Sequence, residues 1–155
     1  MRRFSFNFIA ALIALSIFLT LPGFAQRRGP YRSAAYTRAD VDTLIHRVED
    51  RSDAFVKLFD NALDQSSLDG TRKEDRLNHK AKELEERLDK VRKEFDRAEG
   101  YQEVREHVEK ALNVSEEINK ALRNRNMNPA TERQWTMLRF ELNKLARVYN
   151  LRPLK

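Results

Sequence analysis

The 155-residue sequence contains no cysteine and only four glycines and four prolines. The absence of cysteine excludes disulfide bonds, thiolate metal ligands, a cysteine nucleophile and a lipid-attachment cysteine. No segment alternates apolar and polar residues for the length of a strand, so β-structure is not expected. The scarcity of glycine and proline, which interrupt regular elements, favours long helices.

A long apolar run occurs near the N-terminus. Arg2 and Arg3 precede the run from Phe8 to Leu21, and the segment PGFA ends at Ala25. This order is typical of a secretory signal peptide, with cleavage predicted before Gln26. The run has 14 residues, whereas a membrane-spanning helix needs about 20. We therefore expect a periplasmic or secreted bacterial protein with no integral membrane span after cleavage; an uncleaved anchor is the alternative.

Charge is distributed unevenly along the remaining chain. Residues 26–38 carry four arginines and no acid, residues 39–122 carry 16 basic and 22 acidic side chains, and residues 123–155 carry eight basic and two acidic ones. Two basic ends around an acidic middle suit an anionic partner, although pairing within the molecule explains the same asymmetry. No nucleic-acid partner is expected, because no recognition motif or basic run interleaved with aromatic residues occurs.

Four segments have the apolar spacing of amphipathic helices. Thr37 with Asp40, and Thr71 with Glu74, are predicted capping pairs, and Asn128 is a predicted N-cap before a proline at the first helical position. The predicted seams are Val41, Leu44, Ile45, Val48, Phe55, Val56, Phe59 and Leu63; Leu77, Ala81, Leu84, Leu88, Val91 and Phe95; Val104, Val108, Ala111, Ser115, Ile118 and Leu122; and Trp135, Leu138, Leu142, Leu145 and Tyr149.

Short connections near Gly70, Gly100 and residues 124–128 favour antiparallel neighbouring helices. The predicted fold is all-α, an antiparallel up-down four-helix bundle over residues 37–151. It follows a signal peptide (1–25) and a flexible leader (26–36), and it precedes a tail (152–155). A continuous elongated coiled coil is the alternative, and the breaks at glycine and proline argue against it.

The stretch DQSSLDGTRKED at residues 64–75 has the composition of a calcium-binding loop. If Gly70 held the conserved sixth position, Gln65 would stand first and Arg76 twelfth, where such a loop requires an aspartate and a bidentate glutamate. The stretch is therefore predicted to be a helix hairpin turn, and no metal site is predicted. Ser115 is expected to bond back to its own helix rather than to serve as a ligand.

No catalytic or cofactor-binding constellation is found. The three histidines do not form the i,i+4 pairs that place two metal ligands on one helix face, and no serine lies in a nucleophile motif. Acidic pairs alternate with Lys and Arg, as on a solvated helix face. We therefore predict a protein that is not an enzyme and has no cofactor. The histidines are His46, His79 and His107.

Two stretches, SDAFVKLFDNALDQSSLDGTRKEDRLN (52–78) and MNPATERQWTMLRFELNKLARVYNL (127–151), give the chain a resemblance to a family of uncharacterised exported all-helical proteins of environmental bacteria. The LDGTRKED turn and the LARVYNL ending are its specific parts, and the similarity covers nearly all of the mature chain. The resemblance implies an exported helical domain, and it brings no activity or catalytic residue.

The side of the fourth helix opposite its seam combines apolar and cationic residues, and it is the predicted interaction surface. One account is intramolecular: the leader covers this side through Tyr31 and Tyr36, or the fourth helix is central and buried on two sides. The other is a contact with an envelope protein or an anionic membrane surface. The residues are Arg133, Met137, Phe140, Lys144, Arg147 and Leu151.

The resulting functional hypothesis is an exported, non-enzymatic helical bundle that acts by macromolecular contact in the cell envelope. One alternative is a bundle that binds a small ligand or metal through its core, and another is a periplasmic chaperone-like protein. Homo-oligomerisation is also possible on this sequence. Because the seams are almost wholly apolar, they favour the contact hypothesis over a ligand-binding core.

Overall fold

The computed structural model describes residues 36–97, 100–123 and 127–155, which form four α-helices and, within these ranges, no strand. The predicted all-α class and the four helices are therefore confirmed. The signal peptide and residues 26–35 of the leader lie outside the described residues. The helices are α1 (Arg38–Asp64), α2 (Arg72–Asp96), α3 (Tyr101–Arg123) and α4 (Pro129–Val148).

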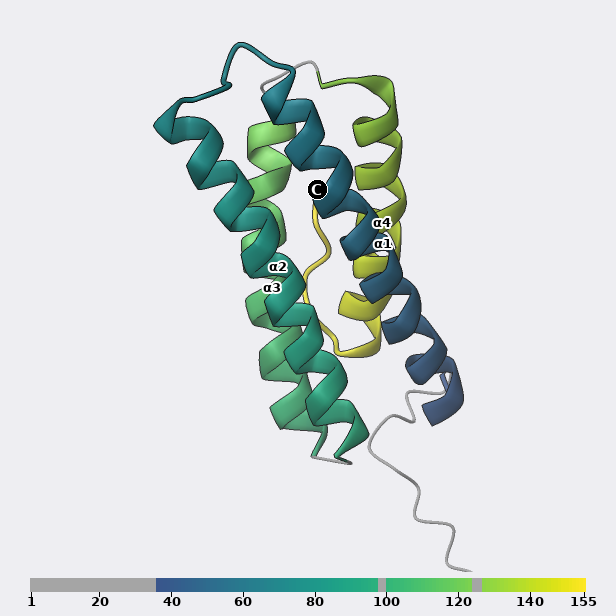
Figure 1. Ribbon diagram of the computed structural model, residues 1–155. Helices are drawn as coiled ribbons and strands as arrows, with labels where there is room; N and C mark the ends of the chain where they lie inside the picture. Colours follow the sequence, from purple (N-terminus) through teal and green to yellow (C-terminus); the bar gives the residue numbers. More distant parts are fainter. Residues whose placement is uncertain (1–35, 98–99, 124–126) are drawn as a thin grey trace, which may run out of the picture.

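Successive helices run in opposite directions around a shared core (Figure 1). α1 packs against α2 and α4, and α2 packs against α3; the contact between α3 and α4 is much smaller than the other three. The arrangement is compact, unlike the elongated coiled coil that was the alternative. It leaves α4 with one side in the bundle, one side against α1 and the remaining surface outward.

The predicted seams line this core. Every seam residue of α2 and α4 is buried, and the exceptions in the other helices are Val56 in α1 and Leu122 in α3, which are half-buried. Aromatic rings fill the space between α1 and α4: the ring of Phe55 lies 5.0 Å from those of Phe59 and Trp135, measured between centroids. Apolar burial of this kind is the main favourable term in the folding free energy.

Side-chain caps begin three helices. Thr37 and Asp40 form the predicted capping box of α1, and the Asn128 side chain accepts a hydrogen bond from the Thr131 N–H of α4. At α2 the Thr71 hydroxyl caps the Glu74 N–H as expected, but the Glu74 carboxylate accepts from the N–H of Gly70. The predicted box at Thr71 and Glu74 is thus shifted by one residue, because the Thr71 N–H bonds to the carbonyl of Leu68, and Gly70 has a φ of 70°.

Polar contacts fix α2 on α1. The guanidinium of Arg92 donates to Asp42 at 2.7 Å and to Glu49 at 3.1 Å, both on α1. The guanidinium of Arg38 donates to the carbonyl of Phe95 and lies 4.5 Å from the centroid of its ring. These bonds connect the two helices at the end of the bundle opposite to the α1–α2 turn.

α4 ends in a turn that reverses the chain. Asn150 has a φ of 52°, its N–H bonds to the carbonyl of Arg147, and the N–H of Leu151 bonds to the carbonyl of Ala146 at 2.8 Å. This is the Schellman pattern, with asparagine in the left-handed position. The C-terminal tail, here residues 151–155, then runs back between α3 and α4 (Figure 1).

Candidate functional site

The outward side of α4 carries the two exposed large apolar side chains of the described residues. Phe140 is 57% exposed and Met137 is 40% exposed. Arg133 and Arg147 are also exposed, and Lys144 is half-buried. We call these five residues the α4 outer surface. Leu151, the sixth residue of the predicted surface, follows the end of α4 and is half-buried against the core.

Each exposed apolar side chain is contacted by a cation. The ammonium nitrogen of Lys144 lies 4.2 Å from the centroid of the Phe140 ring. The guanidinium of Arg51, on α1, donates to the sulfur of Met137 at 3.2 Å. Cations are attracted to aromatic ring faces, and a thioether sulfur is a weak hydrogen-bond acceptor. Arg51 extends the surface onto α1, and the sequence pattern missed it because spacing within α1 does not reveal its neighbour on α4.

A buried carboxylate holds this arrangement in place. Glu141 is only 5% exposed, and its Oε2 atom lies 3.6 Å from Arg47 Nε and 3.3 Å from Lys144 Nζ. A buried charge is tolerated when it is paired. Glu141 therefore anchors Lys144 beside the Phe140 ring, and it links α4 to α1.

The α4 outer surface is positively charged. Its five residues include three cations and no acid, and Arg51 adds a fourth cation at its edge. Apart from the buried Glu141, the acid of α4 is Glu132. Residues 129–155 carry six basic and two acidic side chains, whereas α1 carries four basic and seven acidic ones. Three of these six basic residues, Arg133, Lys144 and Arg147, belong to the α4 outer surface.

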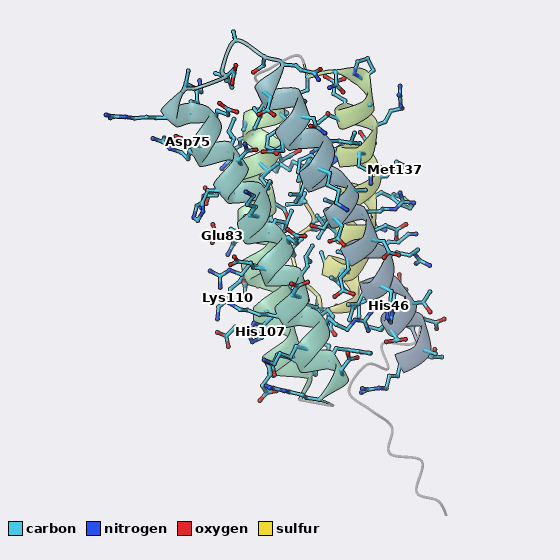
Figure 2. The ribbon with its side chains drawn as sticks, viewed as in Figure 1. His46, Asp75, Glu83, His107, Lys110 and Met137 are labelled. Carbon is cyan, nitrogen blue, oxygen red and sulfur yellow. The ribbon has the colours of Figure 1, made fainter. Side chains whose placement is uncertain are left out.

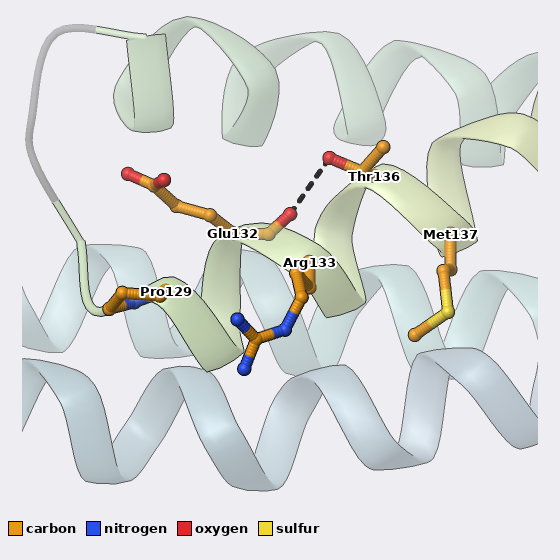
Figure 3. A pocket seen from close by; sticks show the side chains of 5 residues that line it. All are labelled: Pro129, Glu132, Arg133, Thr136 and Met137. Carbon is orange, nitrogen blue, oxygen red and sulfur yellow. Dashed lines mark hydrogen bonds between the residues drawn. The ribbon is translucent and has the colours of Figure 1, made fainter.

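An open surface pocket of about 460 Å³ continues the α4 outer surface toward the start of the helix (Figure 3). Arg133 and Met137 line it together with Pro129, Glu132 and Thr136. The Thr136 hydroxyl is satisfied by the carbonyl of Glu132 at 2.8 Å. Because the lining contains one cation, one thioether and one acid in an open hollow, the pocket offers a place for a flexible chain rather than a closed ligand site.

Tyr36, the first described residue, lies beside the other end of the same surface. It is half-buried against the core and lines a pocket with Asp40, Arg47 and Lys144. The last residue of the predicted leader therefore lies near Lys144, whereas Tyr31 falls outside the described residues. The alternative in which the fourth helix is central, with its outer side buried as well, is wrong, since Phe140 and Met137 are exposed.

Three carboxylates lie close together at the α1–α2 turn, and two of them, Asp64 and Glu74, stand outside the ligand positions of the calcium-binding loop frame considered in the sequence analysis. Ligand oxygens of Asp64, Asp69 and Glu74 all lie within 4.8 Å of one another. Burial raises the pKa of Glu74, and Asp64 and Asp69 add to the rise, while the Gly70 N–H opposes it. Calcium takes six to eight oxygen ligands, so three carboxylates alone do not define a site. Arg76, the twelfth residue of the frame, is exposed on α2.

The histidines lie apart. His46 and His79 are exposed and His107 is half-buried, and within the described ranges none belongs to a group of three potential metal ligands. Figure 2 shows His46 on α1 and His107 on α3, at separate positions on the bundle. Met137 lies at the α1–α4 edge, away from His107. Ser115 donates to the carbonyl of Ala111, as predicted for a hydroxyl that bonds back to its own helix.

Comparison of the chain with protein-family models, with curated proteins and with solved structures finds no match. The resemblance to exported all-helical proteins therefore stays a prediction. Among the described residues, no helix has both the length and the apolar character needed to cross a bilayer.

Proposed function

We propose that the protein is an exported, non-enzymatic helical bundle that docks through the α4 outer surface onto an anionic membrane surface of the cell envelope. The observation that carries the proposal is the pair of exposed apolar side chains, Phe140 and Met137, each contacted by a cation. Exposed apolar groups set among cations suit the boundary between lipid headgroups and acyl chains.

The energetics of such a contact are additive along the helix. From Arg133 to Arg147 the α4 outer surface covers 15 residues, and its two ends are about 21 Å apart at the helical rise. Each Lys or Arg near an anionic bilayer contributes about 1 kcal/mol. The Phe140 ring adds the burial of apolar area, and the long stems of Arg51 and Lys144 keep their charges at the headgroup level.

A bilayer suits this surface better than a protein partner does. Phe140 stands on the outer, convex side of a helix, and a fluid headgroup layer accepts a convex surface without matching its shape. The leader is a poor cover for it, because residues 26–35 carry three arginines and no acid and would face a positive surface. The same basic leader would add to the attraction of an anionic membrane.

The hypothesis of a core ligand has less support. The residues that fill the core are almost wholly apolar, and the buried hydroxyl groups of Ser115 and Thr131 donate to the carbonyls of Ala111 and Leu58. The buried Ser52 hydroxyl has no hydrogen-bond partner in the described part of the chain, but one isolated hydroxyl does not form a set of converging groups. A ligand-binding core needs convergent polar groups that are free to bind. The packing therefore favours contact through the surface.

Co-sedimentation with vesicles tests the proposal. Wild-type protein should sediment with vesicles of mixed phosphatidylglycerol and phosphatidylcholine, but not with phosphatidylcholine alone, and added salt should release it. Phe140→Asp should abolish sedimentation. Asn113→Asp is the matched control, because it makes the same charge change at an exposed residue of α3, and it should bind nearly as the wild type does.

Other results would overturn the proposal. Equal binding to neutral and anionic vesicles would show that the cations of the α4 outer surface do not contribute to membrane binding. Failure to bind vesicles, combined with Phe140-dependent capture of an envelope protein, would replace the membrane with a protein partner. The export step has its own test: the mature N-terminus should be Gln26 in the periplasm or medium, and recovery of full-length protein in washed membranes would contradict cleavage.

A further inference from the structure

The C-terminal tail occupies a groove between α3 and α4, the pair of neighbouring helices that contact each other least. We propose that this groove is a peptide-binding site: it holds residues 151–155 as a resident ligand and accepts an extended, leucine-containing peptide of another molecule in their place. The site is separate from the α4 outer surface, and the inference does not depend on the proposed function.

Two asparagine side chains form hydrogen bonds with the backbone of the tail. Asn143 Oδ1 accepts from the Leu154 N–H at 2.7 Å, and Asn143 Nδ2 donates to the Leu154 carbonyl at 3.2 Å. This two-point contact resembles the bonds of a neighbouring strand, by which extended peptides are recognised without regard to side-chain identity. Asn119, on α3, donates to the backbone oxygen of Lys155 at 2.7 Å. Both helices therefore hold the same short segment.

A single side chain of the tail's last four residues enters the groove. Leu154 is 8% exposed, whereas Arg152, Pro153 and Lys155 are exposed. Backbone contacts from the groove combined with one buried anchor are the usual pattern of extended-peptide recognition. The ligand class that fits is therefore an extended segment with one leucine anchor, of which the tail itself is the first example.

The tail fills the groove incompletely. A pocket of about 330 Å³ remains between α3 and the tail, lined by Leu112, Glu116 and Lys120 from α3 and by Pro153 and Leu154 from the tail. A segment with a larger side chain in the place of Pro153 would occupy this space. Another peptide that fills this pocket would therefore bind with higher intrinsic affinity than the tail segment does.

The tail can leave without unfolding the bundle. It follows the Schellman turn at Asn150 and contains no helix, so the release of residues 152–155 breaks a few side-chain bonds and exposes one buried leucine, Leu154. Local openings of this kind need less free energy than global unfolding. A tethered tail nevertheless competes at an effective concentration in the millimolar range, so an external peptide binds wild-type protein weakly until the tail is weakened.

The full-length variant Leu154→Asp tests the site, because it places a charge where the apolar anchor sits. Fluorescein-labelled Leu-Arg-Pro-Leu-Lys should bind this variant roughly tenfold more tightly than it binds wild-type protein, once the competing tail is weakened. Fluorescence anisotropy measures the binding. The peptide Leu-Arg-Pro-Asp-Lys is the matched control and should not bind, and adding Asn143→Ala to the variant should remove the binding of the leucine peptide.

The single tryptophan supplies an internal readout. Trp135 Nε1 donates to Asn119 Oδ1 at 3.1 Å, and Asn119 in turn holds the tail. The emission of Trp135 should shift when Leu154→Asp displaces the tail and should return when the leucine peptide fills the groove. Equal binding of the two peptides, or no binding to a folded variant, would overturn the proposal.

Hydrogen exchange of wild-type protein keeps the test valid should the variant not fold. The Leu154 amide should exchange through local opening, and therefore faster than the amide of Leu142 in the middle of α4. Addition of the leucine peptide at millimolar concentration should change the exchange rate of the Leu154 amide and leave that of the Leu142 amide unchanged. If both amides exchange only through global unfolding, the tail is a fixed part of the bundle and the proposal fails.

Discussion

The ammonium group of Lys144 lies 4.2 Å from the centre of the Phe140 ring, and the same nitrogen is 3.3 Å from the carboxylate of Glu141. One half-buried cation thus joins a buried carboxylate to an exposed aromatic ring. The ring itself contributes little to folding, because more than half of its surface stays in water.

Phe140→Asp should therefore change the free energy of unfolding by less than about 1 kcal/mol. The lost contact between cation and ring is worth about 0.5–1 kcal/mol at an exposed site, and an aspartate would attract the same ammonium group. Urea unfolding followed by circular dichroism measures the change. A loss of several kcal/mol would show that the ring is covered, and deletion of residues 26–35 would then identify the leader as the cover if it causes a similar loss.

Two substitutions on α2, two positions apart, test which face of this helix is buried. Leu88 is 2% exposed and Lys90 is exposed. Leu88→Ala should lower the free energy of unfolding by about 2–5 kcal/mol through lost apolar burial and the cavity that remains. Lys90→Ala, the control on the same helix, should change it by less than about 0.5 kcal/mol. Equal effects at the two positions would mean that the register is wrong.

Asn119 should stabilise the bundle through the chain of bonds from Trp135 to the tail. Asn119→Ala leaves the buried indole N–H without an acceptor and frees the tail, and an unsatisfied buried donor costs about 1–3 kcal/mol. Thermal or urea unfolding measures this loss. Asn113→Ala removes an exposed asparagine of the same helix and should be nearly neutral. A neutral Asn119→Ala would contradict the bond between α3 and α4.

The acidic cluster at the α1–α2 turn should make stability depend on pH. Burial, with help from Asp64 and Asp69, raises the pKa of Glu74 in the folded protein. A carboxyl whose folded pKa is raised binds its proton more tightly when folded, so its contribution to stability is present at low pH and is lost as pH rises through the folded pKa. Asp64→Asn lowers that pKa and relieves the repulsion.

Asp64→Asn should therefore be more stable than wild-type protein at pH 7, and the difference should shrink as pH falls toward the ordinary glutamate pKa of about 4.3. Urea unfolding across this pH range measures the difference. The control is Asp75→Asn, because Asp75 is an exposed acid in the first turn of α2, beside Glu74. This substitution should not stabilise the protein at neutral pH. A difference between Asp64→Asn and wild type that does not vary with pH would contradict the role of Glu74.

The four helices were predictable because each one repeats its apolar residues at helical spacing over many turns. Leu84, Leu88 and Leu142 occupy the buried positions that this spacing predicts. The caps at Thr37 and Asn128 were also predictable, since a cap depends on residues only a few positions apart.

Contacts between distant residues had no such signal. Asn119 and Asn143 are polar residues of the kind that usually lie on a helix surface, so the sequence does not mark them. Their hydrogen bonds to Lys155 and Leu154 form because the chain reverses direction after α4. Arg51 likewise reaches Met137 across the interface of α1 and α4, 86 positions away. The exposed side of α4 could be predicted from periodicity within one helix, whereas the neighbours that shape it depend on how the helices pack.

The most direct measurement of the central claim is the environment of residue 140 at a membrane. Because the chain contains no cysteine, Phe140→Cys labelled with the environment-sensitive dye NBD reports from that position alone, and labelled Lys90→Cys on α2 is the control. We expect the emission at residue 140 to shift to the blue and to intensify with vesicles containing phosphatidylglycerol, while residue 90 stays in water. No shift at residue 140, or equal shifts at both residues, would contradict docking through the α4 outer surface.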